Sequence, residues 1–349
     1  MIAHEAAIRW AANAPSAAML AAALRGELPP IRVERILPTA EQVLEEGARR
    51  RPETSRIWSI SGPPLLLKRY ADAAQYRTEV GNLRFFNAVA RAHTPRLLAC
   101  DAAAHALLIE DSDGPTVAAM EALGGLVAQR TWERVLAAIA AVHLRAGQQM
   151  ALLRRLYAPH WPAIAAVPAV DVLEAAMDAW LTSRRQPPLT VSERGMLIAA
   201  GSWLQERLNV AYMHYRMPIA GVVSVHGIVV NADRIIFTEM TQAPLGLQPA
   251  DLLCTWQCAD RRALIEQCYL AECARLGAPP VAELFWELDS VLTVAACAAR
   301  LRRLARLEPT AFEDLAGMTA ATCALLARTA QQLEALQGAA ALIERLTGS

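Results

Sequence analysis

The order of strand-like and helix-like segments divides this chain into two unequal parts near residue 114. Before that point, short apolar runs alternate with charged residues and turns, as in strands with one buried face. Beyond it, apolar residues recur mainly with the helical period. The exception is segment 221–240, where two apolar runs flank Asn231-Ala232-Asp233, a typical hairpin turn. The pattern predicts an α+β protein with a small β-rich part and a large helical part that contains one β-hairpin.

The first part carries patterns for five strands and two helices. Thr39 and Gln42 form a capping-box pattern that predicts a helix ending at Pro52. A second helix is expected over 73–92. The strands are expected within 31–38, 56–60, 65–70 and, as a pair around a turn, 95–110. We therefore expect three regions, which are a helical extension (1–30), a five-stranded N-lobe with one inserted helix (31–113) and a helical C-lobe (114–349).

Composition narrows the class of protein. Of 349 residues, 54% are hydrophobic, enough to bury more than one core. Lys and Arg total 34, as do Asp and Glu, and this balance does not favour nucleic-acid binding. The Ala-rich first 30 residues are interrupted by charges and Pro15, unlike a signal peptide or a membrane span.

The seven cysteines are odd in number and include no CxxC pair. This usage favours reduced thiols in a cytoplasmic protein. Cys254 and Cys258 stand four residues apart, but they lack the further ligands of a zinc site.

The chain contains a single lysine, Lys68, among 34 basic residues. A compact ammonium contacts phosphates and a carboxylate together, in a space that a planar guanidinium fits less well. The alternative is a solvated lysine near a strand end. We favour the functional interpretation, because Lys and Arg are not interchangeable at such a site.

Several features follow one another in a recognisable order. Lys68 in a strand precedes Glu79 in a helix, the acidic segment 110–114, a long helix ending in AAVHLRAG, and His226-Gly227 before the hairpin. This order resembles that of the aminoglycoside phosphotransferase family, relatives of the choline kinases and protein kinases.

The likeness covers about residues 30–330 and implies a two-lobed protein kinase-like fold. It implies that Lys68 holds nucleotide phosphates, that Glu79 pairs with this lysine, and that Glu110 and Asp111 belong to the hinge beside the nucleotide base. The cofactors implied are ATP and Mg²⁺.

The segment after His226 departs from the family pattern. The family writes HGDLHPGN before the first hairpin strand, whereas this chain runs directly from Gly227 into Ile228. The missing residues include the aspartate that accepts the substrate proton and the asparagine that holds magnesium. We expect His226, like His143, to be structural and assign no catalytic base. Three later residues match the family tail A-x-x-G-x-x-x-x-D in register: Ala243, Gly246 and Asp251.

Two more positions bear on metal and nucleotide binding. Glu239 falls where the family has a metal-binding aspartate, and it could still reach Mg²⁺, although polarity at a strand end explains it equally well. In place of a glycine-rich loop, segment 39–56 has only Gly47, and we favour a capped surface helix there. Its charges are of mixed sign: Glu41, Glu45, Glu46, Arg49, Arg50 and Arg51.

The sequence thus favours a pseudokinase, which would bind a nucleotide, a small molecule or a protein partner without phosphoryl transfer. The alternative is an active ATP-dependent small-molecule phosphotransferase that uses Lys68, Glu79 and Glu239. A purely structural helical protein would leave the order of these residues unexplained. Segment 150–215 would choose the substrate, and it contains acidic residues that suit a cationic ligand: Asp171, Glu174, Asp178 and Glu193.

Overall fold

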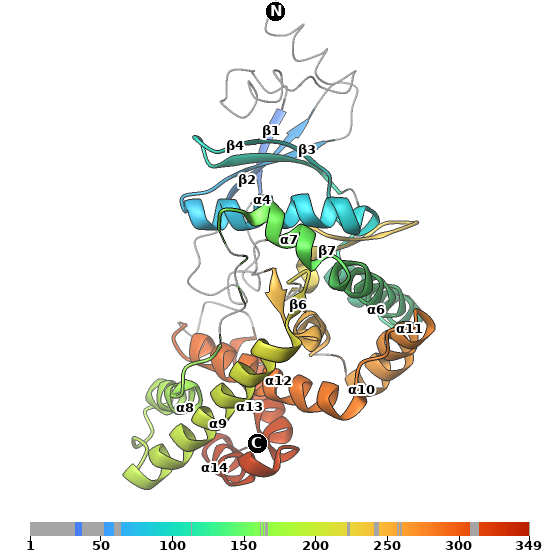
Figure 1. The fold of residues 1–349 in the computed structure, drawn as a ribbon. Helices are drawn as coiled ribbons and strands as arrows, with labels where there is room; N and C mark the ends of the chain where they lie inside the picture. Colours follow the sequence, from blue (N-terminus) through green and yellow to red (C-terminus); the bar gives the residue numbers. More distant parts are fainter. Residues whose placement is uncertain are drawn as a thin grey trace, which may run out of the picture.

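The computed structural model describes residues 32–36, 52–58, 64–112, 114–160, 162, 164, 167–221, 224–240, 244–256, 258, 260–307 and 314–348. Within them the chain forms two stacked parts, a sheet with one helix above a larger helical part (Figure 1). The predicted extension 1–30, the capping-box helix with Gly47 and its neighbouring charges, and Ala243 lie outside the described residues.

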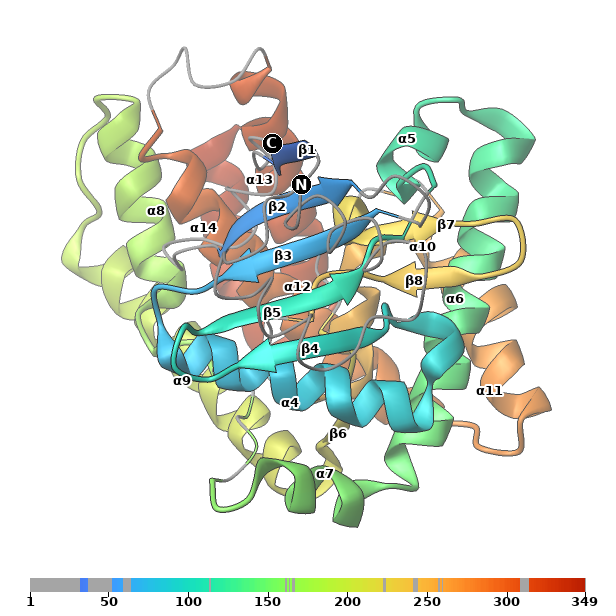
Figure 2. The same ribbon diagram turned by 90° about the horizontal axis from the view of Figure 1, so that it is seen from above.

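The upper part is the predicted five-stranded sheet. Its strands are antiparallel and follow the order β1-β2-β3-β5-β4 (Figure 2). The elements of this part are β1 (Arg32–Ile36), β2 (Glu53–Trp58), β3 (Leu65–Arg69), α4 (Ala73–Val89), the 3-10 turn η1 (Arg91–His93), β4 (Leu97–Asp101) and β5 (Ala106–Glu110).

The two faces of the sheet have different neighbours. Leu66, Leu107 and Ile109 pack with Phe86 of α4 in the main core, whereas alternate residues of the same strands form a separate small cluster. Because side chains alternate across a strand, Lys68 shares the α4 face with Leu66. Sequence alternation therefore points the lysine toward the helical part.

Helix α4 starts where Asp72 caps it, since the Asp72 carboxylate accepts a hydrogen bond from the Ala74 amide at 2.7 Å. The predicted apolar positions Tyr76, Val80 and Leu83 are all buried. Glu79 lies on the same buried stripe and is completely covered. Such burial of a carboxylate requires partners.

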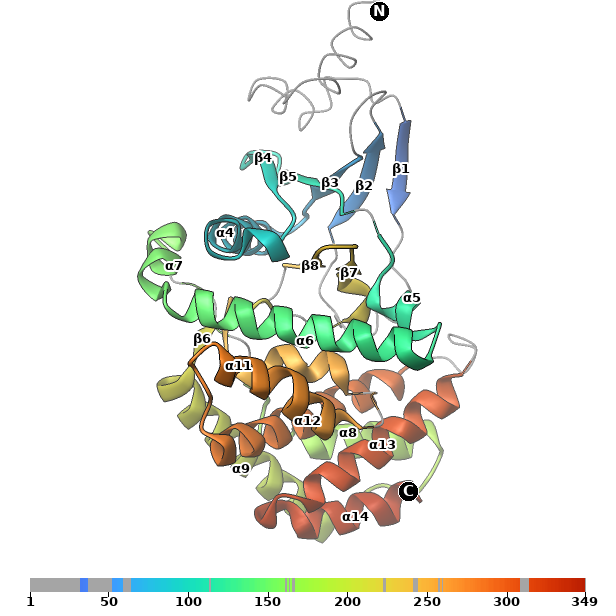
Figure 3. The ribbon, with the colours of Figure 1, turned by 90° about the vertical axis from the view of Figure 1, so that its right-hand side faces the viewer.

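The lower part is mainly helical, as predicted, and α6 runs between the sheet layer and the remaining helices (Figure 3). Its first elements are α5 (Val117–Glu121), α6 (Gly125–Gly147), α7 (Met150–Tyr157), α8 (Val172–Ser183), α9 (Val191–Tyr215), β6 (Met217–Pro218), η2 (Val225–Gly227), β7 (Ile228–Val230), β8 (Ile235–Phe237) and β9 (Leu245–Gly246). Its later elements are η3 (Gln248–Thr255), α10 (Arg261–Leu264), η4 (Ile265–Leu270), α11 (Ala271–Arg275), α12 (Ala282–Leu304), α13 (Leu315–Gln331), η5 (Glu334–Leu336) and α14 (Gln337–Thr347).

Two local expectations are corrected. The sequence predicted a single hairpin in this part, but β6 also pairs with β9, which lies far along the chain. The stretch 250–277 was expected to be helical throughout, yet it begins as a 3-10 helix, η3, and contains a π-helical turn, η4. Strands of two residues carry no periodic signal, and periodicity does not separate 3-10, α and π turns over so few residues.

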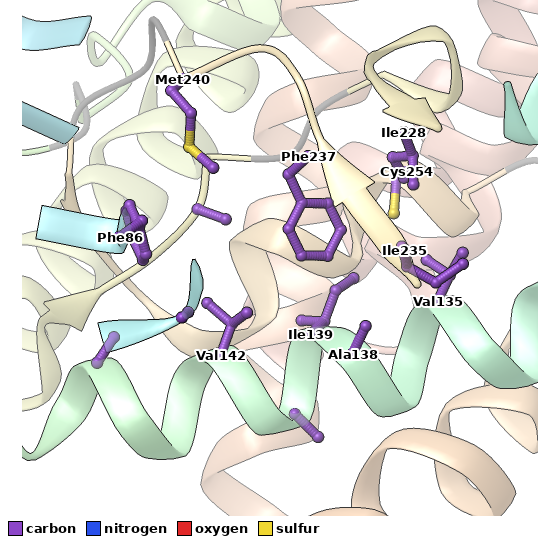
Figure 4. Close-up of a cluster of buried hydrophobic side chains, with 14 of the residues drawn as sticks. Phe86, Val135, Ala138, Ile139, Val142, Ile228, Ile235, Phe237, Met240 and Cys254 are labelled. Atoms are coloured by element: carbon purple, nitrogen blue, oxygen red, sulfur yellow. The ribbon is translucent and has the colours of Figure 1, made fainter. Parts of the chain in front are cut away.

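The β7–β8 hairpin rests on α6 through the main core. Phe237 and Ile235 point toward Ile139, Val135 and neighbouring α6 side chains (Figure 4). At its tip, an Arg134 guanidinium nitrogen of α6 donates to the Asn231 carbonyl at 2.6 Å. The hairpin is therefore fixed at both its body and its turn.

A buried polar network holds the chain just before the hairpin. The His143 imidazole lies 2.9 Å from the Asp251 carboxylate and 2.8 Å from the Tyr269 hydroxyl. Asp251 also accepts the Ala220 amide at 2.8 Å. The predicted core histidine, His143, and the tail aspartate, Asp251, are therefore hydrogen-bond partners in the buried interior.

Within the residues described, no single helix has the length and apolar character to cross a membrane, and α6 with α7 meets that test only as a pair bent by 76°.

Two glycines of α9 offer a stability test. A Cβ at Gly201 would lie 1.9 Å from the Val170 carbonyl oxygen, whereas one at Gly195 would meet nothing within 4 Å. Gly195→Ala should raise the free energy of unfolding by about 0.5–1 kcal/mol. Gly201→Ala should lower it by about 1–3 kcal/mol through overpacking. Urea unfolding of both variants measures the difference, and equal stabilisation would contradict this packing.

Candidate functional site

Lys68 and Glu79 form the centre of the site. The Lys68 ammonium nitrogen lies 2.6 Å from a Glu79 carboxylate oxygen, which joins β3 to α4. The two side chains are 8% and 0% exposed, so the pair is almost entirely removed from water. Each charge depends on the other, because a lone buried charge is very costly.

Tyr70 supplies a second partner for Glu79. Its hydroxyl donates to the other carboxylate oxygen of Glu79. Tyr70 lies two residues after Lys68, so strand alternation places both side chains on one face. Both oxygens of the buried carboxylate are therefore engaged, and the orientation of Glu79 is fixed.

The pair also reaches the end of the hairpin. Lys68 donates to the Thr238 carbonyl at 3.3 Å. The Thr238 amide donates to the Gly227 carbonyl at 2.9 Å, and its hydroxyl reaches the same oxygen at 3.1 Å. A chain of contacts thus connects the N-lobe lysine to His226-Gly227, two motifs that are far apart in sequence.

Glu239 lies over Gly227. A Cβ built on Gly227 would come within 2.9 Å of a Glu239 carboxylate oxygen, so the glycine makes room for this side chain. Lys68 contacts Thr238, and Thr238 directly precedes Glu239 in the chain. The Glu239 carboxylate and Lys68 therefore belong to the same part of the structure. His226 is half-buried in the turn η2, where its amide donates to the Ser224 hydroxyl at 3.1 Å.

Asn82 ties α4 to the segment after β8. Its side-chain amide donates to the Met240 carbonyl at 2.7 Å and accepts the Tyr157 hydroxyl at 2.6 Å. Burial raises the pKa of the Tyr157 hydroxyl, so it stays a neutral donor. The Glu79 helix, α7 and the chain beside Glu239 are thereby held together.

The two predicted hinge residues are engaged by arginines. Asp111 is buried and pairs with Arg56, which stands opposite Leu66 and therefore faces the α4 side of the sheet. Glu110 lies 4.0 Å from Arg234 of the hairpin, and both side chains are partly exposed. The Asp111 amide is bonded to the Pro64 carbonyl at 3.1 Å. Asp113 lies outside the described residues.

Gly114 brings the end of the hinge against the hairpin. Its φ of 145° is unfavourable for other residues, and a Cβ there would lie 2.9 Å from the Val230 carbonyl oxygen. One residue later, the Pro115 carbonyl accepts the Val230 amide at 2.8 Å. The hinge and β7 are thus in direct contact.

Glu239 is the sequence-predicted metal-binding residue. No three His, Cys, Asp or Glu side chains among the described residues gather closely enough to hold a metal ion. Glu239 supplies one carboxylate beside Gly227, while Asn231 and Asp233 lie at the far end of β7 and β8 from Gly227. Mg²⁺ usually binds one or two carboxylates together with substrate phosphates and water, so the metal-binding role of Glu239 stays a prediction.

Sequence reasoning missed four contributors to this site. Tyr70 could have been found from its i+2 spacing to Lys68, which places it on the same strand face. Asn82 and Thr238 gave no such signal. Asn82 donates to a backbone carbonyl distant in the chain, and Thr238 contributes its own backbone carbonyl to the distant Lys68. The pairing of Arg56 with Asp111 depends on strand register and was equally hidden.

Comparisons with solved structures bear on the fold. A choline/ethanolamine kinase family protein from Mesorhizobium loti is 14% identical, with all of both chains covered and a TM-score of 0.52. A Ralstonia eutropha protein assigned to the aminoglycoside phosphotransferases is 12% identical over 85% of this chain and 90% of its own, with a TM-score of 0.55. The choline kinase LicA from Streptococcus pneumoniae is 11% identical over 88% and 96%, with a TM-score of 0.53.

The chain has the two-lobed kinase-like fold. No protein-family model matches its sequence, and no curated protein matches it significantly. At identities this low, the kinase-like fold is what the likeness establishes. The predicted fold class is confirmed, and the roles of the site residues stay predictions.

The buried pair can be tested by its energetics. Lys68→Met should lower the free energy of unfolding by about 3–5 kcal/mol, because Glu79 is left charged and buried. The double variant Lys68→Met/Glu79→Met should lose less than the two single changes combined, with a coupling above about 1 kcal/mol. Urea unfolding of the four proteins measures this cycle.

The exposed pair Arg35–Glu53, at 3.2 Å, serves as the matched control. Its coupling should fall below about 1 kcal/mol, as for solvent-exposed pairs. Similar coupling in the two cycles would contradict a special role for burial at Lys68.

Proposed function

We propose that this protein is a pseudokinase, which binds a nucleotide or another anionic ligand between its lobes and does not transfer a phosphoryl group. The proposal is based on a contrast between two parts of the site, the ion pair of Lys68 and the segment after Gly227. The Lys68–Glu79 pair is intact and joined to Thr238, but Gly227 leads directly into the buried strand Ile228–Val230.

The Lys68 ammonium has a hydrogen-bond donor available for a ligand. An ammonium has three N–H donors, and Lys68 uses two of them on Glu79 and the Thr238 carbonyl. The third donor is engaged by none of the described residues, and a phosphate oxygen or another anionic group would accept from it. Binding at this point needs no rearrangement of the ion pair.

The segment in which the family carries its catalytic base has no such residue here. From Gly227 to Val230 the chain has no ionisable side chain, and the three strand residues are buried. The loss of a general base typically costs 10²- to 10⁴-fold in rate. Phosphoryl transfer also relies on metal ions to neutralise charge, and the family's magnesium-binding asparagine is missing from the sequence after Gly227. These losses favour binding over turnover.

An active small-molecule phosphotransferase is the second candidate, and the position of Glu239 favours it. This carboxylate lies over Gly227, next to the residue that contacts Lys68. It is placed to accept a proton from a substrate hydroxyl or to contact a cation, provided that the substrate approaches Gly227.

Nucleotide binding can be tested by thermal shift with ATP, with and without Mg²⁺. At about 100 times the dissociation constant, ATP should stabilise the wild-type protein by roughly 2.7 kcal/mol. The double variant Lys68→Met/Glu79→Met should show no shift with ATP, because it lacks the Lys68 ammonium. Replacing Glu79 as well avoids leaving a buried carboxylate without its partner. Lys68→Arg is the matched control, and it should keep the ion pair yet respond less, because a planar guanidinium fits a phosphate differently.

Turnover separates the two candidates. ADP release should stay at background when amino-alcohol and sugar acceptors are added to the wild-type protein. ADP release that Lys68→Arg and Glu239→Gln abolish would establish the active enzyme instead. The absence of an ATP shift in the wild-type protein would contradict nucleotide binding and leave only the fold.

A further inference from the structure

A groove runs along α12 in the helical part, and none of its lining residues belongs to the site around Lys68 and Gly227. It consists of two adjoining spaces of about 820 and 530 Å³. Helices α12 and α13, which form two of its walls, lie on the other side of α6 from the sheet (Figure 3). The residues that line both spaces are Arg262, Trp286, Ser290 and Gln332.

The charges along the groove are largely compensated within the protein. Three ion pairs line it, namely Arg207–Glu287, Arg261–Asp289 and Arg262–Glu266. The other charged lining residues are exposed and of both signs, namely Asp260, Arg328 and Glu334. A charged ligand would therefore lose water without meeting a buried counter-charge, which favours an uncharged ligand.

Two buried donors that line the 530 Å³ space lack acceptors. Thr293 is 3% exposed, and its hydroxyl has no hydrogen-bond partner within the described residues. The same is true of Arg261 Nε, although the terminal nitrogens of this guanidinium bind Asp289. By contrast, the buried hydroxyls of Thr319 and Thr322 donate to carbonyls four residues earlier, at 2.6 and 2.8 Å. Because unsatisfied buried donors are costly, an acceptor oxygen from a ligand would stabilise this space.

The groove also offers aromatic surface. Trp203 of α9 and Trp286 of α12 are half-buried rings that line the larger space. Trp286, Ser290 and Thr293 are separated by four and three residues, so they share one face of α12. This face extends about 10 Å from Trp286 to Thr293. The Ser290 hydroxyl and the exposed Gln332 amide add groups that both donate and accept.

We propose that the groove binds a short neutral oligosaccharide that carries an acetamido group. A sugar ring has an apolar face that packs on tryptophan, and hydroxyls that match mixed donors and acceptors. One ring would lie against Trp203. The acetamido carbonyl would accept from both the Thr293 hydroxyl and Arg261 Nε, since a carbonyl oxygen has two lone pairs. A cavity of about 150 Å³ holds benzene, so the two spaces have room for several rings.

The same groups disfavour other ligand classes. A cationic amino sugar would place an ammonium, which only donates, beside two donors. An organic acid would bring a negative charge to Arg261, whose charge Asp289 already compensates. A purely apolar molecule would leave both buried donors without an acceptor.

The test is a saturation-transfer NMR titration of the full-length protein without nucleotide. The probes are three β-1,4-linked trimers with the same backbone, built from N-acetylglucosamine, glucosamine or glucose. The N-acetylglucosamine trimer should bind at least about tenfold more tightly than the other two. The glucosamine trimer carries ammonium groups instead of acetamido groups, and the glucose trimer lacks the carbonyl.

Variants of the groove should weaken binding of the N-acetylglucosamine trimer. Thr293→Val removes one buried donor while keeping the shape of the side chain, and it should lower the affinity by roughly three- to tenfold. Gln332→Ala changes an exposed side chain that the fold does not need, and it should lower the affinity by about threefold.

Thr319→Val is the matched control, since it removes a buried helical hydroxyl outside the groove. It should bind the N-acetylglucosamine trimer as the wild-type protein does. The proposal is overturned if this trimer does not bind, if the glucosamine trimer binds equally well, or if Thr293→Val and Gln332→Ala leave the affinity unchanged. None of these results depends on whether ATP binds between the lobes.

Discussion

The arrangement of the two lobes depends on a buried pair of opposite charges, Lys68 and Glu79. Neither charge would be stable alone in this position, since each is almost fully removed from water. The structure satisfies them with further polar partners, the Tyr70 hydroxyl on one side and the Thr238 carbonyl on the other. Because Thr238 belongs to the segment after the hairpin, satisfying the pair also fixes the sheet above the helical part.

The same contacts hold the segment before the hairpin. Thr238 bonds to the Gly227 carbonyl, and Glu239 occupies the space above this glycine. The His226 amide donates to the Ser224 hydroxyl. These contacts position His226-Gly227 beside the hairpin, where the chain passes directly from Gly227 into β7.

The sequence predicted the fold because each large element has its own local signal. Alternation identified the five strands, and helical spacing identified α4, α6, α8 and α9. The same signals placed Lys68 in a strand and Glu79 in a helix, and the resemblance implied that the two residues pair. The π-helical turn η4 and the two-residue strands β6 and β9 were not predicted, because their formation depends on tertiary neighbours rather than on a repeated pattern.

The candidate site was only partly predictable, for a related reason. Charged residues such as Lys68 and Glu239 are recognisable by type. Lys68 and Asn82, in contrast, donate to backbone carbonyls, which look alike in any sequence. The contact of Arg56 with Asp111 depends on the register of β2 against β3. The residues that join β2 to β3 did not predict this register, so the contact required the structure.

The use of arginine elsewhere in the chain explains why a single lysine is informative. In the helical part, guanidinium groups stack on aromatic rings, as Arg300 does on Trp256 and Arg262 does on Trp286 at 4.7 Å. The Arg261 guanidinium donates hydrogen bonds to both carboxylate oxygens of Asp289. These contacts use the planar, forked shape of arginine, which lysine lacks. Between β3 and α4 the chain instead needs a compact cation that reaches a carboxylate and a carbonyl at once, and it is there that lysine occurs.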